Sequence, residues 1–121
     1  MEKIEELLME KIMVKDLIAT DLAVSVEDGD LLFEKIVSYL KNSKKIILDF
    51  SDLDLITTAF LNNAFGKLYS KFDAETLNEY IKIANIRKGD LINLKDVRDR
   101  AVHSSNVNFK AALLEELGED E

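Results

Sequence analysis

The sequence predicts an α/β domain in which a mixed or mostly parallel β-sheet of about four strands packs against helices. Short apolar segments rich in β-branched residues alternate along the chain with amphipathic stretches of ten or more residues, a pattern typical of crossover units. Residues 46–50 form a nearly continuous apolar run, which is typical of a strand buried on both faces of a sheet. A hydrophobic content of 47% is enough for one continuous core.

The first third of the chain supplies two predicted strands and the first long helix. Residues 11–18 are apolar with β-branched members and predict a strand, and residues 22–26 predict a second short strand or an extended lead-in. Ser25 is followed three residues later by Asp28, which is close to a capping box, and apolar residues then recur at helical spacing. We therefore expect a helix from about residue 27 to residue 41.

The buried strand at residues 46–50 opens the second part of the chain. A polar loop follows it, after which Thr57 or Thr58 can cap a helix whose wide apolar stripe reaches Phe72. The later elements are predicted in this order: a helix or turn at residues 74–78, a strand at 80–86, a polar-faced helix at 88–104 and a last amphipathic helix at 109–117.

Length and composition exclude several classes of function. The 121 residues suit one domain, in which we expect residues 1–9 to be an N-terminal extension and residues 106–121 a C-terminal helix with an acidic tail. The absence of Cys excludes disulfides, and with a single His we expect no metal and no cofactor. A net charge of −8 disfavours nucleic acid and anionic lipid as partners. No apolar run suits a transmembrane helix or a signal peptide, so the expected location is the cytoplasm.

Two groups of residues resemble a known family. Residues 47–51 (Ile-Leu-Asp-Phe-Ser), followed by Leu53 and by residues 56–60 (Ile-Thr-Thr-Ala-Phe), are similar to the signature of STAS domains, the anti-sigma factor antagonist fold. In that signature a strand ends in Asp, an apolar residue and Ser, and an Asp-Ser pair begins a helix a few residues later. Residues 24–29 and 59–69 resemble the bacterial STAS-like family of unknown function. The resemblance covers most of the chain and implies a single STAS-like domain.

The resemblance implies a non-enzymatic regulatory role in which the domain docks onto a protein partner, such as an ATP-binding anti-sigma-type kinase. In STAS regulators the kinase phosphorylates the Ser at the helix start, and phosphorylation releases the complex. Thr58 matches that Ser and Thr57 matches the Asp before it, so the candidate phosphoacceptors are Thr58 and Thr57. The small Gly that usually follows is replaced by Ala59 and Phe60. A phosphate here would place about −1.5 to −2 charges in the centre of the docking face.

The predicted docking face consists of the loop after the buried strand and the start of the next helix. Its candidate partner-binding residues are Ser51, Asp52, Asp54, Thr57, Thr58, Asn62 and Asn63. For the two threonines the alternative role is helix capping. Two successive Asn residues are unusual inside a helix because Asn is a poor helix former. They can bind a partner, or one of them can hydrogen-bond a neighbouring loop carbonyl.

A second hypothesis is a small-ligand or nucleotide sensor that uses a pocket at the end of the buried strand, near Asp49 and Asn62. Ligands of α/β domains commonly bind at that end of a sheet. An enzyme is not expected, because the sequence offers no nucleophile–base pair and no metal-ligand set. The oligomeric state is open, and a homodimer is compatible with the sequence. We expect Gly66 to permit close helix packing and Gly29 to be tolerated near a helix start.

Overall fold

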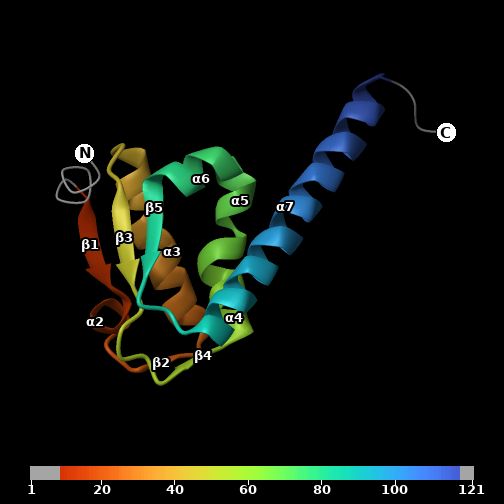
Figure 1. The fold of residues 1–121 in the computed structure, drawn as a ribbon. Helices are drawn as coiled ribbons and strands as arrows, with labels where there is room; N and C mark the ends of the chain where they lie inside the picture. The colour runs from red at the N-terminus through yellow and green to blue at the C-terminus, as the bar shows by residue number, and fades with distance from the viewer. Residues whose placement is uncertain (1–8, 118–121) are drawn as a thin grey trace.

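Two parallel sheets organise the molecule. The computed structural model describes residues 9–117, with side chains for residues 9–103. The larger sheet has the strand order β1-β3-β5, and the smaller sheet pairs β2 with β4. Figure 1 shows the smaller sheet beyond the C-terminal ends of the strands of the larger one. The bounds are Glu10–Met13 for β1, Leu22–Ala23 for β2, Ile46–Asp49 for β3, Leu55–Ile56 for β4 and Ile81–Ala84 for β5.

Helices connect the strands and cover one face of the larger sheet. They are α2 (Val14–Ile18), α3 (Val26–Lys41), α4 (Thr58–Leu61), the π-helical turn η1 (Asn62–Gly66), α5 (Leu68–Lys71), α6 (Ala74–Tyr80) and α7 (Lys88–Leu117). Helix α3 lies behind the larger sheet in Figure 1, with α4, η1 and α5 beside it. The first part of α7 packs on α4, η1 and α5, and the helix then extends away from the body of the domain (Figure 1).

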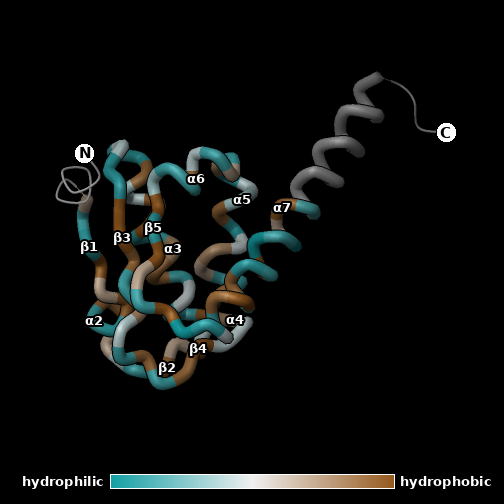
Figure 2. The backbone as a smooth tube through the Cα atoms, in the orientation of Figure 1, coloured by the Kyte–Doolittle hydropathy of each residue, from teal (hydrophilic) through white to brown (hydrophobic). Residues whose placement is uncertain are grey.

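One hydrophobic core lies between the larger sheet and the helices. Ile12, Leu48 and Ile83 are neighbours across the three strands, so their side chains share one face of the sheet. Helix α3 presents Leu32 and Ile36 to the same core, and both are fully buried. Figure 2 shows a hydrophobic stretch along β3. Each buried aliphatic side chain of this size stabilises the fold by roughly 1.5–3 kcal/mol.

The predicted fold class is confirmed. The described residues form an α/β domain whose strands are all parallel and pack against helices. They form five strands in two sheets, whereas the sequence predicts about four. The extra strand is β4, which at two residues is too short to give a recognisable alternation. Within the part of the chain that the structure describes, no helix is long and apolar enough to cross a membrane.

The predicted strand at residues 11–18 is wrong in its second half. Strand β1 ends at Met13 and the chain turns at once into α2, whose Val14 and Ile18 are buried. Because Val14, Leu17 and Ile18 fit helical spacing as well as a short apolar run, pattern alone does not separate the two states. The short helix ends at Ala19, which adopts a left-handed conformation.

Two predicted helix boundaries also need correction. The helices expected at residues 88–104 and 109–117 form one continuous helix, α7. The polar segment between them contains neither Gly nor Pro, so nothing forces the helix to stop. In contrast, the single helix expected up to Phe72 is divided into α4, η1 and α5. The π-helical turn falls on the weak helix formers Asn62, Asn63 and Gly66.

The roles expected of the two glycines are reversed in the structure. A Cβ at Gly29 would lie 2.9 Å from Cβ of Asn63 and 3.0 Å from the carbonyl oxygen of Phe60, closer than van der Waals contact allows. A Cβ at Gly66 would meet no atom within 4 Å. Gly29 is therefore the residue that permits close packing, and it seats the first turn of α3 against α4 and η1.

Candidate functional site

Two strand–helix units begin side by side at the smaller sheet. Strand β2 leads into α3 and strand β4 leads into α4, and each helix is capped by a side-chain hydroxyl. Ser25 Oγ accepts a hydrogen bond from the backbone N–H of Asp28 at 3.0 Å, and Thr57 Oγ1 accepts one from Phe60 at 3.2 Å. Thr57 Oγ1 also donates to the carbonyl of Val24 at 3.3 Å, which joins the two units.

Thr57 and Thr58 therefore play different parts. The hydroxyl of Thr57 is half-buried and both donates and accepts hydrogen bonds, as a helix cap does. Thr58 is the first residue of α4, is exposed, and makes no side-chain hydrogen bond within the described part of the chain. Of the two candidate phosphoacceptors, Thr58 is the one with an accessible hydroxyl.

The two asparagines also differ. Asn63 Nδ2 donates to the carbonyl of Val26 at 2.7 Å and to the carboxylate of Asp30, so it ties η1 to the first turn of α3. Lys67 Nζ contacts the same Asp30 carboxylate at 2.6 Å. Asn62 is exposed on η1. One asparagine thus bonds a neighbouring carbonyl, which was one of the two alternatives, and Asn62 is the one whose side chain is left accessible to a partner.

Exposed apolar side chains also lie on the smaller sheet and at the start of α3, and the sequence pattern does not single them out. Leu22 and Leu55 are neighbours in the smaller sheet and are 43% and 50% exposed, while the next pair, Ala23 and Ile56, is buried. Val26, at the start of α3, is 51% exposed. We call the exposed residues at this end of the molecule the corner surface: Leu22, Val26, Asp52, Asp54, Leu55, Thr58 and Asn62.

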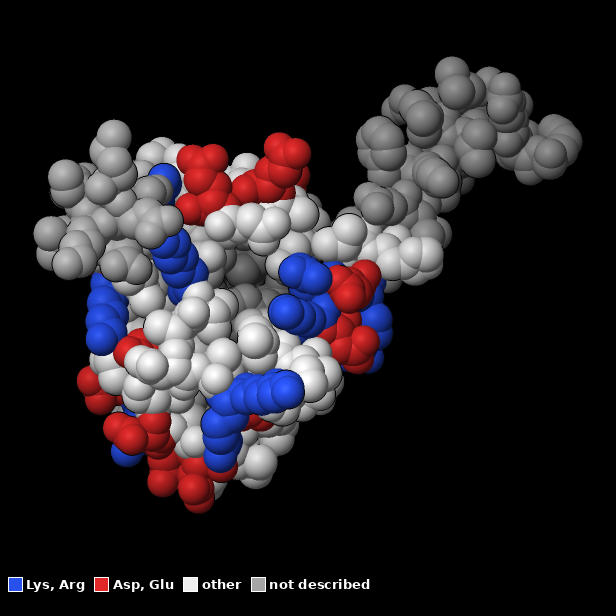
Figure 3. Space-filling model, in the orientation of Figure 1, with Lys and Arg blue, Asp and Glu red and all other residues white. Residues whose placement is uncertain are grey.

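The charge at this end of the domain is predominantly acidic. Figure 3 shows acidic side chains gathered where the smaller sheet lies. Asp52 and Asp54 are both exposed, and Asp52 adopts a left-handed backbone conformation with φ 61°. The carbonyl of Asp54 accepts a hydrogen bond from Nη2 of Arg87 at 3.1 Å, which fastens the loop to the start of α7. The corner surface thus combines apolar side chains with an acidic rim.

The remaining predicted residue, Ser51, belongs to a different cluster at the end of β3. Asp49 is only 2% exposed, and its Oδ1 accepts hydrogen bonds from the amide of Ser51 at 2.8 Å and from its hydroxyl at 2.5 Å. The other oxygen, Oδ2, accepts from Asn85 at 3.0 Å and forms an ion pair with Lys11 at 3.2 Å. We call Lys11, Asp49, Ser51 and Asn85 the strand-end cluster.

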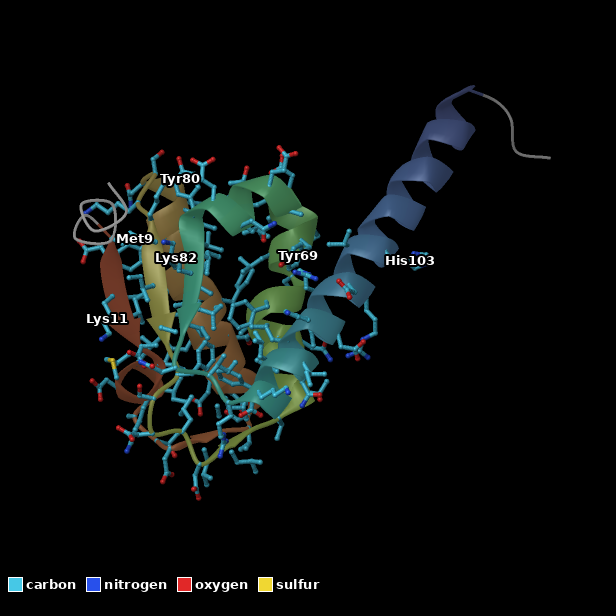
Figure 4. The ribbon with its side chains drawn as sticks, in the orientation of Figure 1. Met9, Lys11, Tyr69, Tyr80, Lys82 and His103 are labelled. Carbon is cyan, nitrogen blue, oxygen red and sulfur yellow. The ribbon has the colours of Figure 1, made fainter. Side chains whose placement is uncertain are left out.

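This cluster holds the three strands of the larger sheet together. Lys11 lies on β1, Asp49 on β3 and Asn85 directly after β5. Figure 4 shows Lys11 on the outer strand β1. Burial by itself raises the pKa of Asp49, but the hydrogen bonds from Ser51, Lys11 and Asn85 outweigh it and lower the pKa to about 2. Asp49 is therefore a charged structural tie at ordinary pH.

The predicted ligand site near Asp49 and Asn62 stays a prediction. Both carboxylate oxygens of Asp49 are engaged in the strand-end cluster, whereas Asn62 lies exposed on η1. Among the described residues, no three His, Cys, Asp or Glu side chains are grouped so as to hold a metal ion.

The fold and this site define the class of the protein: a parallel α/β domain in which a hydroxyl-bearing corner follows the central strand. A family model described as STAS-like domain of unknown function (DUF4325) matches residues 28–91, more than half of the 121 residues. The chain therefore belongs to this STAS-like family, which confirms the resemblance inferred from the sequence. The matched segment contains both Asp49 and Thr58. No curated protein and no solved structure matches the chain.

Proposed function

We propose that the chain is a non-enzymatic STAS-like regulatory domain that docks onto a protein partner through the corner surface. The observation that carries the proposal is the exposed hydroxyl of Thr58 on the helix that directly follows the smaller sheet with its exposed leucines, while Thr57 alone caps this helix. Exposed aliphatic side chains within a polar rim are typical of protein-binding surfaces. The residues proposed to contact the partner are Asp52, Asp54, Thr58 and Asn62 from the predicted set, joined by Leu22, Val26 and Leu55.

The proposed partner is an ATP-binding kinase of the anti-sigma type, with Thr58 as the phosphoacceptor. Phosphorylation would add about −1.5 to −2 charges to a surface that already carries Asp52 and Asp54. It would also add a strongly hydrated group to a surface that carries the exposed Leu22 and Leu55. Both effects oppose docking, because like charges repel and because the apolar side chains can no longer be buried without desolvating the phosphate. Phosphorylation is thus proposed to release the partner.

Retention of proteins from a native lysate tests the proposal. Immobilised wild-type chain, Thr58→Glu and Ser38→Glu are compared, and retained proteins are identified by mass spectrometry. Ser38 is an exposed hydroxyl on α3, so Ser38→Glu controls for the added charge alone. We expect wild type and Ser38→Glu to retain an ATP-binding kinase, and Thr58→Glu to lose it. Equal retention by Thr58→Glu, or no kinase retained by any form, would contradict the proposal.

A phosphorylation assay separates the switch from the docking. The retained kinase is incubated with ATP and wild type, Thr58→Ala or Thr57→Ala, and modified residues are mapped. Phosphate is expected on Thr58 of the wild type and of Thr57→Ala. Phosphate on Thr57, or unchanged incorporation into Thr58→Ala, would remove Thr58 from the proposed switch while leaving the docking surface to be judged by retention.

A further inference from the structure

An apolar cavity lies between β5 and the helices α5, α6 and α7, and none of the corner-surface residues lines it. Its volume is about 140 Å³, it opens to solvent on one side, and it is lined by residues of η1, α5, α6, β5 and the first part of α7. Figure 3 shows the molecule hollowed in this region, with basic side chains on its α7 side. The cavity forms because β5 is the last strand of its sheet and α7 packs on α4, η1 and α5 rather than closing over the strand.

The interior of the cavity is hydrocarbon. Leu77 and Leu94 are buried in its wall, and Ile81 and Ile83 line it from the inward face of β5. A site lined in this way offers water too few hydrogen-bond partners to hold it in place. A cavity of about 150 Å³ with a comparable lining accepts benzene, so the space here matches one aromatic ring or a branched hydrocarbon of similar size.

Cationic groups mark one side of the cavity. Lys95 and Arg98 both line it and lie three residues apart on α7, so they share one face of the helix. The side chain of Arg98 is 41% exposed and bonds the neighbouring Asp99 through Nε at 3.2 Å and Nη2 at 3.0 Å. No described ion pair involves Lys95. Asp99 does not line the cavity but compensates much of the charge of Arg98, so the positive charge that faces the cavity outside the described ion pairs is that of Lys95.

Two polar side chains complete the mouth. Asn78 lines the cavity from α6 and is exposed. Tyr69 lines it from α5, and Figure 4 shows this residue beside α7. Burial raises the pKa of the Tyr69 hydroxyl, while the nearby Arg98 lowers it and Asp99 raises it, with a net upward shift. The phenol is therefore protonated at ordinary pH.

We propose that this cavity binds a small carboxylate with a compact apolar body, the body filling the hydrocarbon interior and the carboxylate meeting Lys95 and Arg98. Size excludes nucleotides, and the apolar wall disfavours sugars and inorganic anions. The site is separate from the corner surface, so the proposal does not depend on the proposed function. An aromatic monocarboxylate such as benzoate is the simplest molecule with the required shape and charge.

Titration of the full chain with sodium benzoate, followed by amide NMR shifts, tests the proposal. Saturable shifts below about 10 mM ligand are expected at residues of the cavity wall. Benzyl alcohol, which keeps the ring and lacks the charge, is expected to bind about 3–10-fold more weakly. Shifts that do not saturate, shifts centred elsewhere, or equal binding of benzyl alcohol would overturn the proposal.

Variants separate the two halves of the site. Arg98→Gln and Lys95→Gln are each expected to weaken benzoate about 3–10-fold and to leave benzyl alcohol unchanged. Arg100→Gln is the matched control, because Arg100 lies on α7, pairs with Asp96 and does not line the cavity. Leu91→Trp is expected to fill the cavity and abolish binding of both molecules, with Ile83→Phe used if it does not fold. Equal losses in Arg98→Gln and Arg100→Gln, or unchanged binding in the filled variant, would overturn the assignment.

Discussion

The strand-end cluster and the corner surface both include residues from the segment at and after the end of β3, but the two groups differ in burial and in hydrogen bonding. The cluster is centred on the 2% exposed Asp49, whose two oxygens are fully engaged by Ser51, Asn85 and Lys11. Nine residues after Asp49, Thr58 is exposed and makes no side-chain hydrogen bond to another described residue, and Leu55 of the preceding strand is half-exposed. The first region contributes to stability and the second is available for contact.

The difference shows how polar residues at the end of a parallel strand are to be judged. A carboxylate at this place is usually interpreted as part of a ligand site. Both oxygens of Asp49, however, are engaged in hydrogen bonds and an ion pair that link the three strands of the larger sheet. Thr58, in contrast, is exposed and makes no side-chain hydrogen bond to another described residue. Substitutions in the two regions are therefore expected to separate: the first should change the free energy of unfolding, and the second should change binding.

The largest effect on stability is expected for Asp49→Asn. An amide at this position loses the charge that faces Lys11 and turns an NH₂ group toward at least one donor, Asn85 or Ser51. We expect a loss of about 2–4 kcal/mol in the free energy of unfolding, measured by urea denaturation. Asp52→Asn is the matched control, because Asp52 is exposed and Asn tolerates its left-handed backbone. Equal free energies of unfolding for Asp49→Asn and Asp52→Asn would show that the strand-end cluster does not stabilise the sheet.

The pH dependence of the unfolding free energy, compared between wild type and Asp49→Asn, isolates the contribution of the Asp49 charge. Its pKa in the folded chain is about 2, below the ordinary value of 3.8, so ionised Asp49 favours the folded state. This contribution is complete above about pH 4 and disappears as the pH falls toward 2. The stability difference between wild type and Asp49→Asn should therefore narrow between pH 4 and pH 2. A difference that stays constant over that range would contradict the assigned pKa.

Next in size is the packing beneath the corner surface. Gly29→Ala forces a methyl group against Asn63 and the Phe60 carbonyl, and should cost about 1–3 kcal/mol of unfolding free energy. Gly66→Ala meets open space and should be neutral or stabilise by about 0.4–1 kcal/mol through the unfolded state. Thermal and urea denaturation of both variants measure the contrast. A neutral Gly29→Ala would mean that α3 is not seated as closely as described.

Substitutions of the two threonines should differ less in their effect on the unfolding free energy, and this difference tests the roles assigned to Thr57 and Thr58. Thr57→Ala removes the cap of α4 and the bond to Val24, with an expected cost of about 0.5–2 kcal/mol. Thr58→Ala removes no hydrogen bond of the described residues and should stay within about 0.5 kcal/mol of wild type. Urea denaturation again supplies the measurement. A larger loss of stability in Thr58→Ala than in Thr57→Ala would contradict the assignment of Thr57 as the helix cap and Thr58 as the accessible residue.

The smallest contrast is between the neighbouring asparagines. Asn63→Ala breaks the ties to the Val26 carbonyl and to Asp30 and should cost about 0.5–1.5 kcal/mol. Asn62→Ala should leave the unfolding free energy unchanged and weaken retention of the partner. If Asn62→Ala destabilised the domain as much as Asn63→Ala, the accessible role of Asn62 would be lost.

Much of the fold follows from local pattern. Residues 46–50 are apolar enough to identify the central strand, and the Ser25 and Thr57 hydroxyls identify helix starts that the structure places at Val26 and Thr58. The failures share a cause, since a five-residue helix and a two-residue strand are shorter than the periods that reveal them. The division of the helix after Leu61 depends on a tertiary bond from Asn63 to α3, which local pattern does not contain.

The sequence indicates where the candidate site lies, and the binding role of that site stays a prediction. The loop after the central strand and Thr58 follow from the family resemblance, and the exposure of Thr58 agrees with it. That Ser51 turns back to Asp49 depends on the loop's path, which the sequence does not determine. Leu22 and Leu55 could have been suspected, because each precedes a buried residue as in a half-exposed strand. The cavity could not have been predicted from the sequence, because it arises from the placement of α7 relative to β5.

Amide hydrogen exchange of the chain alone and with its retained partner tests the central claim most directly. We predict slowed exchange in peptides covering residues 22–26 and 52–62, which carry the corner surface. Peptides covering residues 81–87, which end β5 beside the strand-end cluster, should exchange at the same rate in both states. Protection of residues 81–87 with no change at residues 52–62 would place the partner on the other region and contradict the proposed docking.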